Sequence, residues 1–176
     1  MRSAMTRPHL ILTAIALLSV ATASHAKDDL GVFGNWAAFR DMDAPRCYAI
    51  AKANAPVLES EKYHDYQPYA TIATWPQRGV RAQLHFRLSR QIRENSRVIL
   101  IIGRKSWRLR GGGGDAWTND QKMDAAVLAA MRSATRMTVR GTDARGRLFT
   151  NRYNLQGAAT AIDAAQLGCA PRNLRG

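Results

Sequence analysis

Apolar and polar residues alternate along much of the chain, and the pattern is clearest in residues 81–90, RAQLHFRLSR. The apolar residues here occupy every second position: Ala82, Leu84, Phe86 and Leu88. Successive side chains of a strand point to opposite faces, so this spacing predicts a strand with one buried face and one face in solvent.

Further stretches also have the composition and spacing of strands. They are GNWAAFRD, RCYAIA, YATIATW, RVILIIG, RKSWRLR, RMTVRG and RLFTNRYNL. RVILIIG is apolar throughout, which is typical of a more fully buried strand, whereas RKSWRLR alternates with Trp107 and Leu109 directed inward. The last two stretches are joined by TDARG, in which Asp143 and Gly146 indicate a turn.

The spacing becomes helical after the glycine-rich residues 111–114. Apolar residues then recur at Met123, Val127, Ala130 and Met131. This period predicts a helix of two to three turns, with Thr118 or Asn119 as its N-terminal cap. A second short helix is predicted in TAIDAAQL, near the end of the chain.

Together these elements predict a mainly β protein with one or two short helices. Short antiparallel strands each bury one face, and sheets of this kind hide that face by stacking on one another. An antiparallel β-sandwich is therefore the expected architecture, and a barrel is the alternative.

The first 26 residues have the parts of a secretory signal peptide. Arg2 and Arg7 precede an apolar run over residues 10–20, and ATASHA then provides small residues before a cut at Lys27. The run is roughly half the length needed to span a membrane, which is about 20 apolar residues. We therefore expect a soluble exported protein in the periplasm, in which residues 27–176 form a single domain with no transmembrane span.

Export bears directly on the two cysteines of the chain, Cys47 and Cys169. Thiols oxidise outside the cytoplasm, so a disulfide between them is expected, with two free buried thiols as the alternative. A metal site is not expected, because there is no CxxC spacing and only His64 and His85 remain after processing. No cofactor is expected either.

The chain is strongly basic, with 26 Lys and Arg residues against 13 Asp and Glu residues. Loss of Arg2 and Arg7 with the signal peptide leaves 24 against 13, a net charge of +11. Such a charge attracts polyanions and anionic surfaces. Nucleic acid is a poor candidate for a partner, because export removes the chain from it and no nucleic-acid-binding motif is present.

The basic residues are concentrated between Arg78 and Arg110, where ten of them accompany a single acid, Glu94. If the two strands in this region share a sheet, alternation places five arginines on one solvent-facing strip, with Arg93 and Arg97 at its end. We call these five the predicted strip: Arg81, Arg87, Arg104, Arg108 and Arg110. Such a strip fits an anionic envelope component or an acidic patch on a partner protein. The alternative is an ordinary solvated face.

Residues 110–117, RGGGGDAW, raise the question of a phosphate-binding loop. Such a loop has a lysine and a hydroxyl residue after its last glycine. Here Asp115 and Ala116 follow instead, and the carboxylate would repel phosphate. A flexible link between the strand of Trp107 and the helix of Met123 is the favoured interpretation.

The chain contains neither a GxSxG nor an HExxH motif, and it is not expected to be an enzyme. His85 alternates with apolar residues and is expected on the polar face of a strand. His64 lies in the loop ESEKYHDYQPY beside Asp65 and Glu61, and a small hydrolase built on this loop is the least favoured alternative. The tyrosines of the loop form either a recognition surface or packing at the open end of the sandwich: Tyr63, Tyr66 and Tyr69.

Residues 107–169 also carry a set of short motifs. They are Trp107 with Leu109, DAW, AAMR, MTVRGTDARG, YNLQGA and the terminal Cys169. This set resembles the invasion-associated locus B family of exported bacterial proteins. Looser matches in GNWAAFRD, RCYAIA and YATIATWPQRG extend the resemblance over most of residues 27–176.

The resemblance implies a periplasmic or envelope protein with an immunoglobulin-like β-sandwich, from a family named for a role in host-cell entry and without an established enzyme activity. It supplies no catalytic residues, and it marks four positions as structural: Trp107, Trp117, Tyr153 and Gly157. We therefore expect a non-catalytic binding or interaction module. A structural or chaperone-like envelope stress protein is the alternative, and a large exposed apolar patch would favour it.

Overall fold

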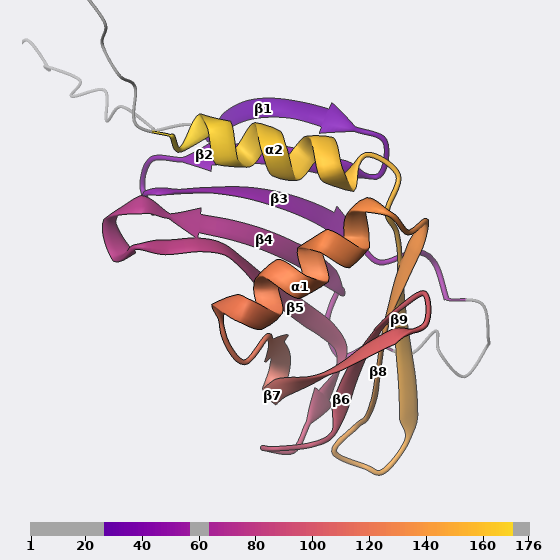
Figure 1. Cartoon of the computed structure of the whole chain (residues 1–176). Helices are drawn as coiled ribbons and strands as arrows, with labels where there is room; N and C mark the ends of the chain where they lie inside the picture. The colour runs from indigo at the N-terminus through magenta and orange to yellow at the C-terminus, as the bar shows by residue number, and fades with distance from the viewer. Residues whose placement is uncertain (1–26, 57–63, 171–176) are drawn as a thin grey trace, which may run out of the picture.

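The computed structural model describes residues 27–56 and 64–170, which form a mainly β protein (Figure 1). The strands of this part of the chain are β1 (Asp28–Phe33), β2 (Trp36–Asp41), β3 (Arg46–Lys52), β4 (Tyr69–Trp75), β5 (Val80–Ile92), β6 (Val98–Ile102), β7 (Lys105–Trp117), β8 (Arg136–Thr142) and β9 (Leu148–Asn154). The helices are α1 (Gln121–Arg132) and α2 (Ala158–Gly168), with a short 3₁₀ turn at Pro76–Arg78. The predicted fold class, mainly β and antiparallel with two short helices, is confirmed.

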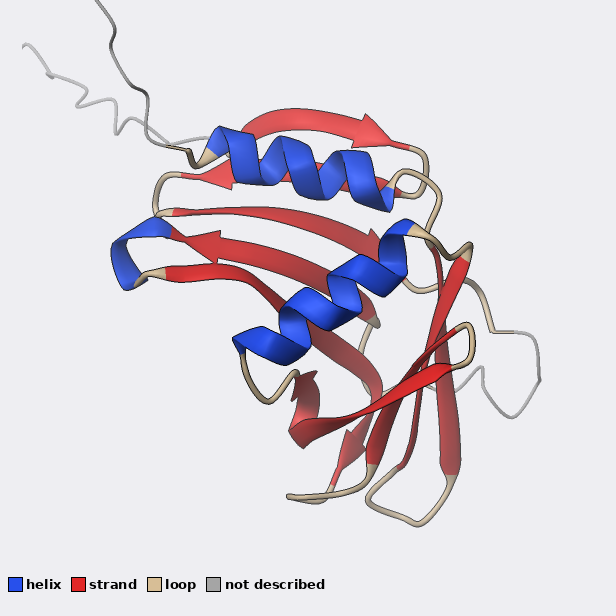
Figure 2. Cartoon of the chain, viewed as in Figure 1, coloured by secondary structure: helices blue, strands red, loops and turns tan. Residues whose placement is uncertain are grey.

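The strands form one antiparallel sheet in the order β1-β2-β3-β4-β5-β7-β6-β8-β9. Strand β7 belongs to two parts of it, because residues 105–109 pair with β6 whereas residues 113–117 pair with β5. We call β1–β5 with the end of β7 the first half, and the start of β7 with β6, β8 and β9 the second half. Figure 2 shows that β8 and β9 run across the direction of β1–β4.

The inner faces of the two halves pack together where β5 meets β9. The rings of Phe86 and Tyr153 lie 5.8 Å apart. The Asn151 side chain accepts a hydrogen bond from the backbone N–H of Ser89 at 3.1 Å and donates one to its hydroxyl at 2.7 Å. Two layers with a shared core agree with the predicted sandwich, and both layers belong to one hydrogen-bonded sheet.

The alternation predicted for β5 is present, since Leu84, Phe86 and Leu88 are all fully buried. Strand β6 departs from its prediction, because Ile99 and Ile101 are only half-buried while the residues between and beside them are buried. The reason is that this strand covers the core with one face only, and its other face lies at the surface of the second half.

The glycine run lies inside β7, so its interpretation as a link between a strand and a helix is wrong. It allows β7 to turn from β6 to β5. Gly113 has a φ of +60°, a conformation that favours glycine. A Cβ on Gly111 would lie 2.7 Å from Ile92, and one on Gly114 would lie 2.3 Å from the Tyr66 ring. The absent side chains therefore let the neighbouring segments approach the bend.

Helix α1 begins one residue later than a cap at Asn119 would place it, and two residues later than a cap at Thr118 would. Its N-cap is Asp120, whose side chain accepts a hydrogen bond from the backbone N–H of Met123 at 2.7 Å. Thr118 and Asn119, the predicted caps, lie before it. The prediction of a cap at either residue is therefore wrong, although the helix itself is present.

The Thr118 hydroxyl instead donates a 2.5 Å hydrogen bond to Asp124, a buried residue in the first turn of α1. Asp124 also accepts a hydrogen bond from the backbone N–H of Leu84 at 2.8 Å. This carboxyl fixes α1 to β5. Burial raises its pKa, and the two hydrogen bonds oppose that rise.

Helix α2 packs against β1–β4, as Figure 1 shows. Ala158, Ala161, Ile162 and Ala165 are buried, and Cys169 follows the last residue of the helix. Cys169 is bonded to Cys47 of β3, with 5.7 Å between their Cα atoms. The predicted disulfide is confirmed, and it holds the end of α2 against the first half.

The start of α2 fits closely against the turn between β1 and β2. Gly157, the residue before the helix, has a φ of +83°. A Cβ at this position would lie 1.8 Å from the backbone oxygen of Phe33. The backbone N–H of Asn35 also donates a hydrogen bond to the Gln156 carbonyl at 3.1 Å. Gly157 is therefore required by both its conformation and its surroundings.

Strand β1 is the element that the sequence pattern did not predict. Its pairing with β2 is irregular between Asp29 and Gly31, so apolar residues do not alternate regularly along it. It is also an edge strand, and half of its residues are exposed. None of the helices in the described residues is long and apolar enough to cross a membrane.

Candidate functional site

The outward side of the second half is lined by arginines. Arg108 of β7 lies opposite Ile99 of β6, and Ile99 lies opposite Arg140 of β8. The residues that alternate with them, among them Leu109 and Val139, are buried, so these three side chains point away from the core. We call the outward side of these strands the basic face, with these arginines: Arg104 in the β6–β7 turn, Arg108, Arg110, Arg136, Arg140 and Arg152.

In the described part of the chain, the basic face has no acidic side chain at the strand positions between its arginines. Its outward positions between the arginines hold polar or apolar residues: Ile99, Ile101, Ser106, Thr138 and Thr150. Arg108, Arg110, Arg136 and Arg140 are exposed. Within the described part of the chain, none of these four forms an ion pair. The face therefore presents a positive field to solvent.

The structure divides the predicted strip between the two halves. Its members Arg104, Arg108 and Arg110 belong to the basic face. Arg81 and Arg87 lie on β5 in the first half. The two strands are neighbours, as the hypothesis supposed, but β5 pairs with residues 113–117 of β7 and not with residues 104–110. The five arginines therefore do not line a single strand-to-strand strip.

Arg87 is already occupied by partners within the fold. Its guanidinium donates a 2.6 Å hydrogen bond to Asp115 and lies 3.8 Å from the centre of the Tyr66 ring. Asp115 also meets the Nε2 atom of His85 at 2.9 Å. The acid that follows the glycine run thus pairs with Arg87 and contacts His85 on the neighbouring strand.

Arg81 lies on a different side of the first half from Arg87. Strand β5 has a bulge here: Gln83 pairs with Ala73 and Val80 pairs with Trp75, so two residues of β5 face one of β4. The extra residue shifts the alternation of the strand. Arg81 consequently lines a cleft against α2, and its predicted place beside Arg87 is wrong.

His85 stands between a carboxylate and a hydroxyl, as in an acid–base chain. Its Nδ1 atom lies 3.4 Å from the Thr71 hydroxyl, and its other nitrogen meets Asp115. Thr71, His85 and Trp117 are also directly opposite one another on β4, β5 and β7. None of these residues lines the cleft between α2 and the β4–β5 hairpin or the one beside the β2–β3 turn. The arrangement is accounted for by cross-strand pairing on an outward face.

The loop around His64 is fixed to β5 through its backbone and Asp65. The Asp65 carboxylate accepts a hydrogen bond from the backbone N–H of Gln91 at 2.8 Å, and its own N–H donates one to the Ser89 carbonyl. Glu61 and Tyr63 lie outside the described residues. The hydrolase alternative on this loop therefore stays untested.

The tyrosines of this loop that are described pack against other side chains. Tyr66 lies against Arg87, and Tyr69 meets His85 with 6.0 Å between ring centres. Trp117 lies on the other side of His85 at 5.2 Å. Packing across the outward face of the first half thus accounts for these rings.

The remaining predicted structural residues lie in the core or at its edge. Tyr153 is fully buried against Phe86, and its hydroxyl has no hydrogen-bond partner among the described residues. Burial raises the pKa of this hydroxyl. Trp107 is half-buried beside the core. Both positions fit a packing role.

The turn between β8 and β9 contains a buried acid at the end of the basic face. Asp143 accepts hydrogen bonds from the backbone N–H groups of Arg145 and Arg147 and from the Arg147 guanidinium at 2.8 Å. Burial, the largest single influence, raises the pKa of Asp143. The hydrogen bonds from Arg147 and Arg145 together outweigh it, so the pKa lies below its usual value.

The described residues also bear on metal binding and on apolar contact surfaces. No group of three or more His, Cys, Asp or Glu side chains there is placed to hold a metal ion. The large apolar side chains that are exposed in this part of the chain lie in β1, the β2–β3 turn, β9 and α2: Val32, Met42, Leu148 and Leu167.

Sequence reasoning missed the basic residues that β8 and β9 contribute: Arg136, Arg140 and Arg152. A signal was present, because RMTVR alternates basic or polar residues with apolar ones. What the sequence did not contain was the pairing of β8 with β6, which brings Arg140 next to the row of Arg108.

The fold is shared with a solved bacterial protein. The crystal structure of invasion associated protein B from Bartonella henselae matches with a TM-score of 0.55 and 12% sequence identity, over 82% of this chain and 99% of that chain. No protein-family model and no curated protein matches the chain. At this identity the likeness shows the fold alone, and that fold agrees with the one that the short motifs implied.

Proposed function

We propose that this chain is an exported, non-catalytic binding module of the cell envelope whose basic face contacts an anionic envelope component. The observation that carries the proposal is a set of exposed arginines on β7 and β8, on either side of β6, that have no acid partner among the described residues: Arg108, Arg110, Arg136 and Arg140. Guanidinium groups form paired hydrogen bonds with phosphate and carboxylate groups.

The compartment in this proposal is supported by two features of the chain. Residues 1–26 have the pattern of a signal peptide, and Cys47 and Cys169 form a disulfide, which is typical of proteins outside the cytoplasm. The fold likeness to invasion associated protein B is compatible with the same assignment.

Vesicle binding tests the proposal directly. The mature protein is expected to sediment with vesicles that contain phosphatidylglycerol and not with vesicles of phosphatidylcholine alone. Binding should weaken steeply as salt is added, because exposed charges are screened within about 8 to 10 Å at physiological ionic strength.

The variant that removes the charge is Arg108→Gln, Arg136→Gln and Arg140→Gln together. Each arginine near an anionic surface contributes about 1 kcal/mol, so the triple variant should bind roughly a hundredfold more weakly. The matched control is Lys52→Gln, Arg78→Gln and Lys122→Gln, which removes the same charge at exposed positions away from the basic face.

Equal losses of vesicle affinity in the two triple variants would show that net charge alone drives binding. The basic face would then not be the binding site. Binding that does not depend on salt would exclude the proposal as well. Cross-linking in intact periplasm adds the remaining outcome: capture of one acidic protein through the basic face would replace the envelope component by a protein partner.

A further inference from the structure

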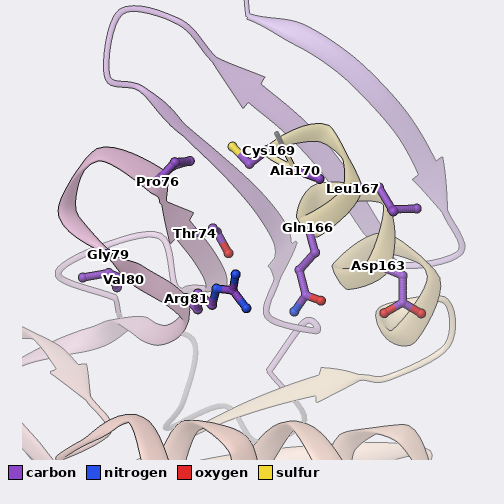
Figure 3. A pocket seen from close by; sticks show the side chains of 10 residues that line it. All are labelled: Thr74, Pro76, Gly79, Val80, Arg81, Asp163, Gln166, Leu167, Cys169 and Ala170. Atoms are coloured by element: carbon purple, nitrogen blue, oxygen red, sulfur yellow. The ribbon is translucent and has the colours of Figure 1, made fainter. Parts of the chain in front are cut away.

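A cleft of about 860 Å³ separates the end of α2 from the hairpin between β4 and β5 (Figure 3). Its volume falls within the range of small-molecule sites, which is about 300 to 1,000 Å³. It lies in the first half of the sheet, and none of the residues of the basic face lines it. An inference about this cleft is therefore independent of the proposed function.

The bulge in β5 directs Arg81 into this cleft. Ala82, the next residue, has a φ of +50°, which is rare for a residue with a side chain. The Thr74 hydroxyl accepts a hydrogen bond from the Ala82 N–H at 3.1 Å and supports this conformation. Bulges of this kind often redirect a side chain at a binding site.

Arg81 is the cation that lines the cleft. Figure 3 shows its guanidinium directed toward Gln166 of α2. The acid of the cleft, Asp163, is held by Arg132 of α1 through hydrogen bonds of 2.5 and 3.2 Å. Among the described residues, Arg81 forms no ion pair. The cleft is therefore suited to one negative charge.

The rest of the lining is largely apolar. Pro76 and Val80 come from the hairpin, and Leu167 and Cys169 come from the end of α2. Leu167 is 75% exposed and adds apolar surface at the edge of the cleft. An apolar wall beside a single cation matches an amphiphile with one anionic head.

We propose that this cleft binds a long-chain carboxylate, with the carboxylate on Arg81 and the alkyl chain along Val80, Pro76 and Leu167. One planar guanidinium matches one carboxylate through two parallel hydrogen bonds, and the Gln166 amide adds a donor. A phosphate monoester carries more charge than one arginine balances, so it fits this cleft less well.

Titration of the oxidised mature protein with decanoate, followed by NMR, tests the inference. Resonances of Arg81, Gln166 and Leu167 are expected to shift together. Arg81→Gln removes a charge-assisted contact, so it should weaken decanoate binding by about tenfold or more. Arg78→Gln is the matched control, because it removes an exposed arginine of the same hairpin that does not line the cleft.

Three results would overturn the inference. They are equal binding by the Arg81→Gln and wild-type proteins, equal binding of decanamide and decanoate, and tighter binding of decyl phosphate than of decanoate. Leu167→Asn is a second, exposed variant that should also weaken binding. The triple variant of the basic face should bind decanoate normally, so failure of either proposal leaves the other intact.

Discussion

The two halves of the sheet both present arginines to solvent, but they differ in what those arginines meet. In the first half, Arg46 lies 3.6 Å from Asp41 and is stacked on two aromatic rings, and Arg87 is paired with Asp115. In the second half, Arg108 and Arg140 form no ion pair with any of the described residues. The basic face therefore offers several neighbouring arginines without acid partners among the described residues, whereas the first half leaves single arginines such as Arg81 unpaired.

The halves also differ in how their inner faces are covered. The first half is closed by α2, which the disulfide attaches to β3. The second half packs its inner face on β5, through Tyr153 and Asn151 of β9. Changes at the covalent closure of the first half should consequently affect stability more than changes in the second half.

Removal of the disulfide should have the largest effect on the free energy of unfolding. The Cys47→Ala and Cys169→Ala double variant frees two residues that are 122 apart in sequence. The chain-entropy relation for so long a loop gives about 4 to 5 kcal/mol of lost stability. Denaturant unfolding of both proteins under non-reducing conditions measures the difference.

Hydrogen exchange shows in which part of the molecule the double variant loses stability. Amides of α2 and β1–β3 should exchange faster in the double variant, relative to global unfolding, than amides of β8 and β9. A loss spread evenly over both halves would contradict the assignment of the disulfide to the closure of the first half.

Two glycines with nearly the same φ provide the next comparison. Gly157, at the start of α2, has a φ of +83°, and Gly146, in the β8–β9 turn, has a φ of +82°. An alanine at either position carries the left-handed penalty of about 1 to 2 kcal/mol. Only Gly157→Ala also forces a Cβ against the backbone oxygen of Phe33, whereas space is open around Gly146. Thermal or denaturant unfolding should show Gly157→Ala as the more destabilising by about 2 kcal/mol.

The two glycine variants are controls for each other, because both remove a glycine from the same region of backbone conformation. Equal losses would mean that conformation alone matters. In that case the close approach of Phe33 to Gly157 would not contribute to the closure of the first half.

Local patterns predicted most of the strands and both helices, because each element here buries one face. The disulfide was also predictable, since an exported chain with two cysteines has one pairing available. The glycine run was misread because residues 111–114 have no side chains, and alternation cannot be seen where all side chains are absent. Its place in β7 depends on Ile92 and Tyr66, which are distant in sequence.

The candidate site was less predictable than the fold, because it depends on strand order. Sequence shows which arginines alternate with buried residues, but not that β7 pairs with β5 through residues 113–117. The bulge at Arg81 is likewise set by the pairing with β4. For these reasons the predicted strip contained three of the arginines of the basic face and two residues that lie elsewhere.

Substitution of Asn151 should have an intermediate effect on the free energy of unfolding, because this residue connects the two halves through Ser89. Asn151→Ala leaves the buried N–H of Ser89 without its acceptor, which costs about 1 to 3 kcal/mol. Thr150→Ala is the neighbouring control on the outward side of β9 and should change stability by less than about 0.5 kcal/mol. Denaturant unfolding measures both losses. Losses of equal size would show that Asn151 does not stabilise the contact between the two halves.

The smallest effect should be a pH dependence of the free energy of unfolding, which has opposite signs for two buried acids. The pKa of Asp143, in the second half, lies below its ordinary value, so its carboxylate stabilises the fold at neutral pH. That contribution is complete above the unfolded-state pKa of about 3.9. It is lost as the pH falls through the lower pKa of the folded state. The stability advantage of the wild type over Asp143→Asn should therefore shrink on acidification.

Asp124, which fixes α1 to β5, provides the opposite case. Its pKa is raised, mainly by burial, so ionisation costs more in the folded state than in the unfolded state. The stability of the wild type relative to Asp124→Asn should accordingly fall as the pH rises through the raised pKa. Unfolding of the three proteins at a series of pH values measures both slopes. Slopes of the same sign would show that Asp143 is not held in its charged form by the Arg145 and Arg147 hydrogen bonds, or that Asp124 is not destabilised by burial.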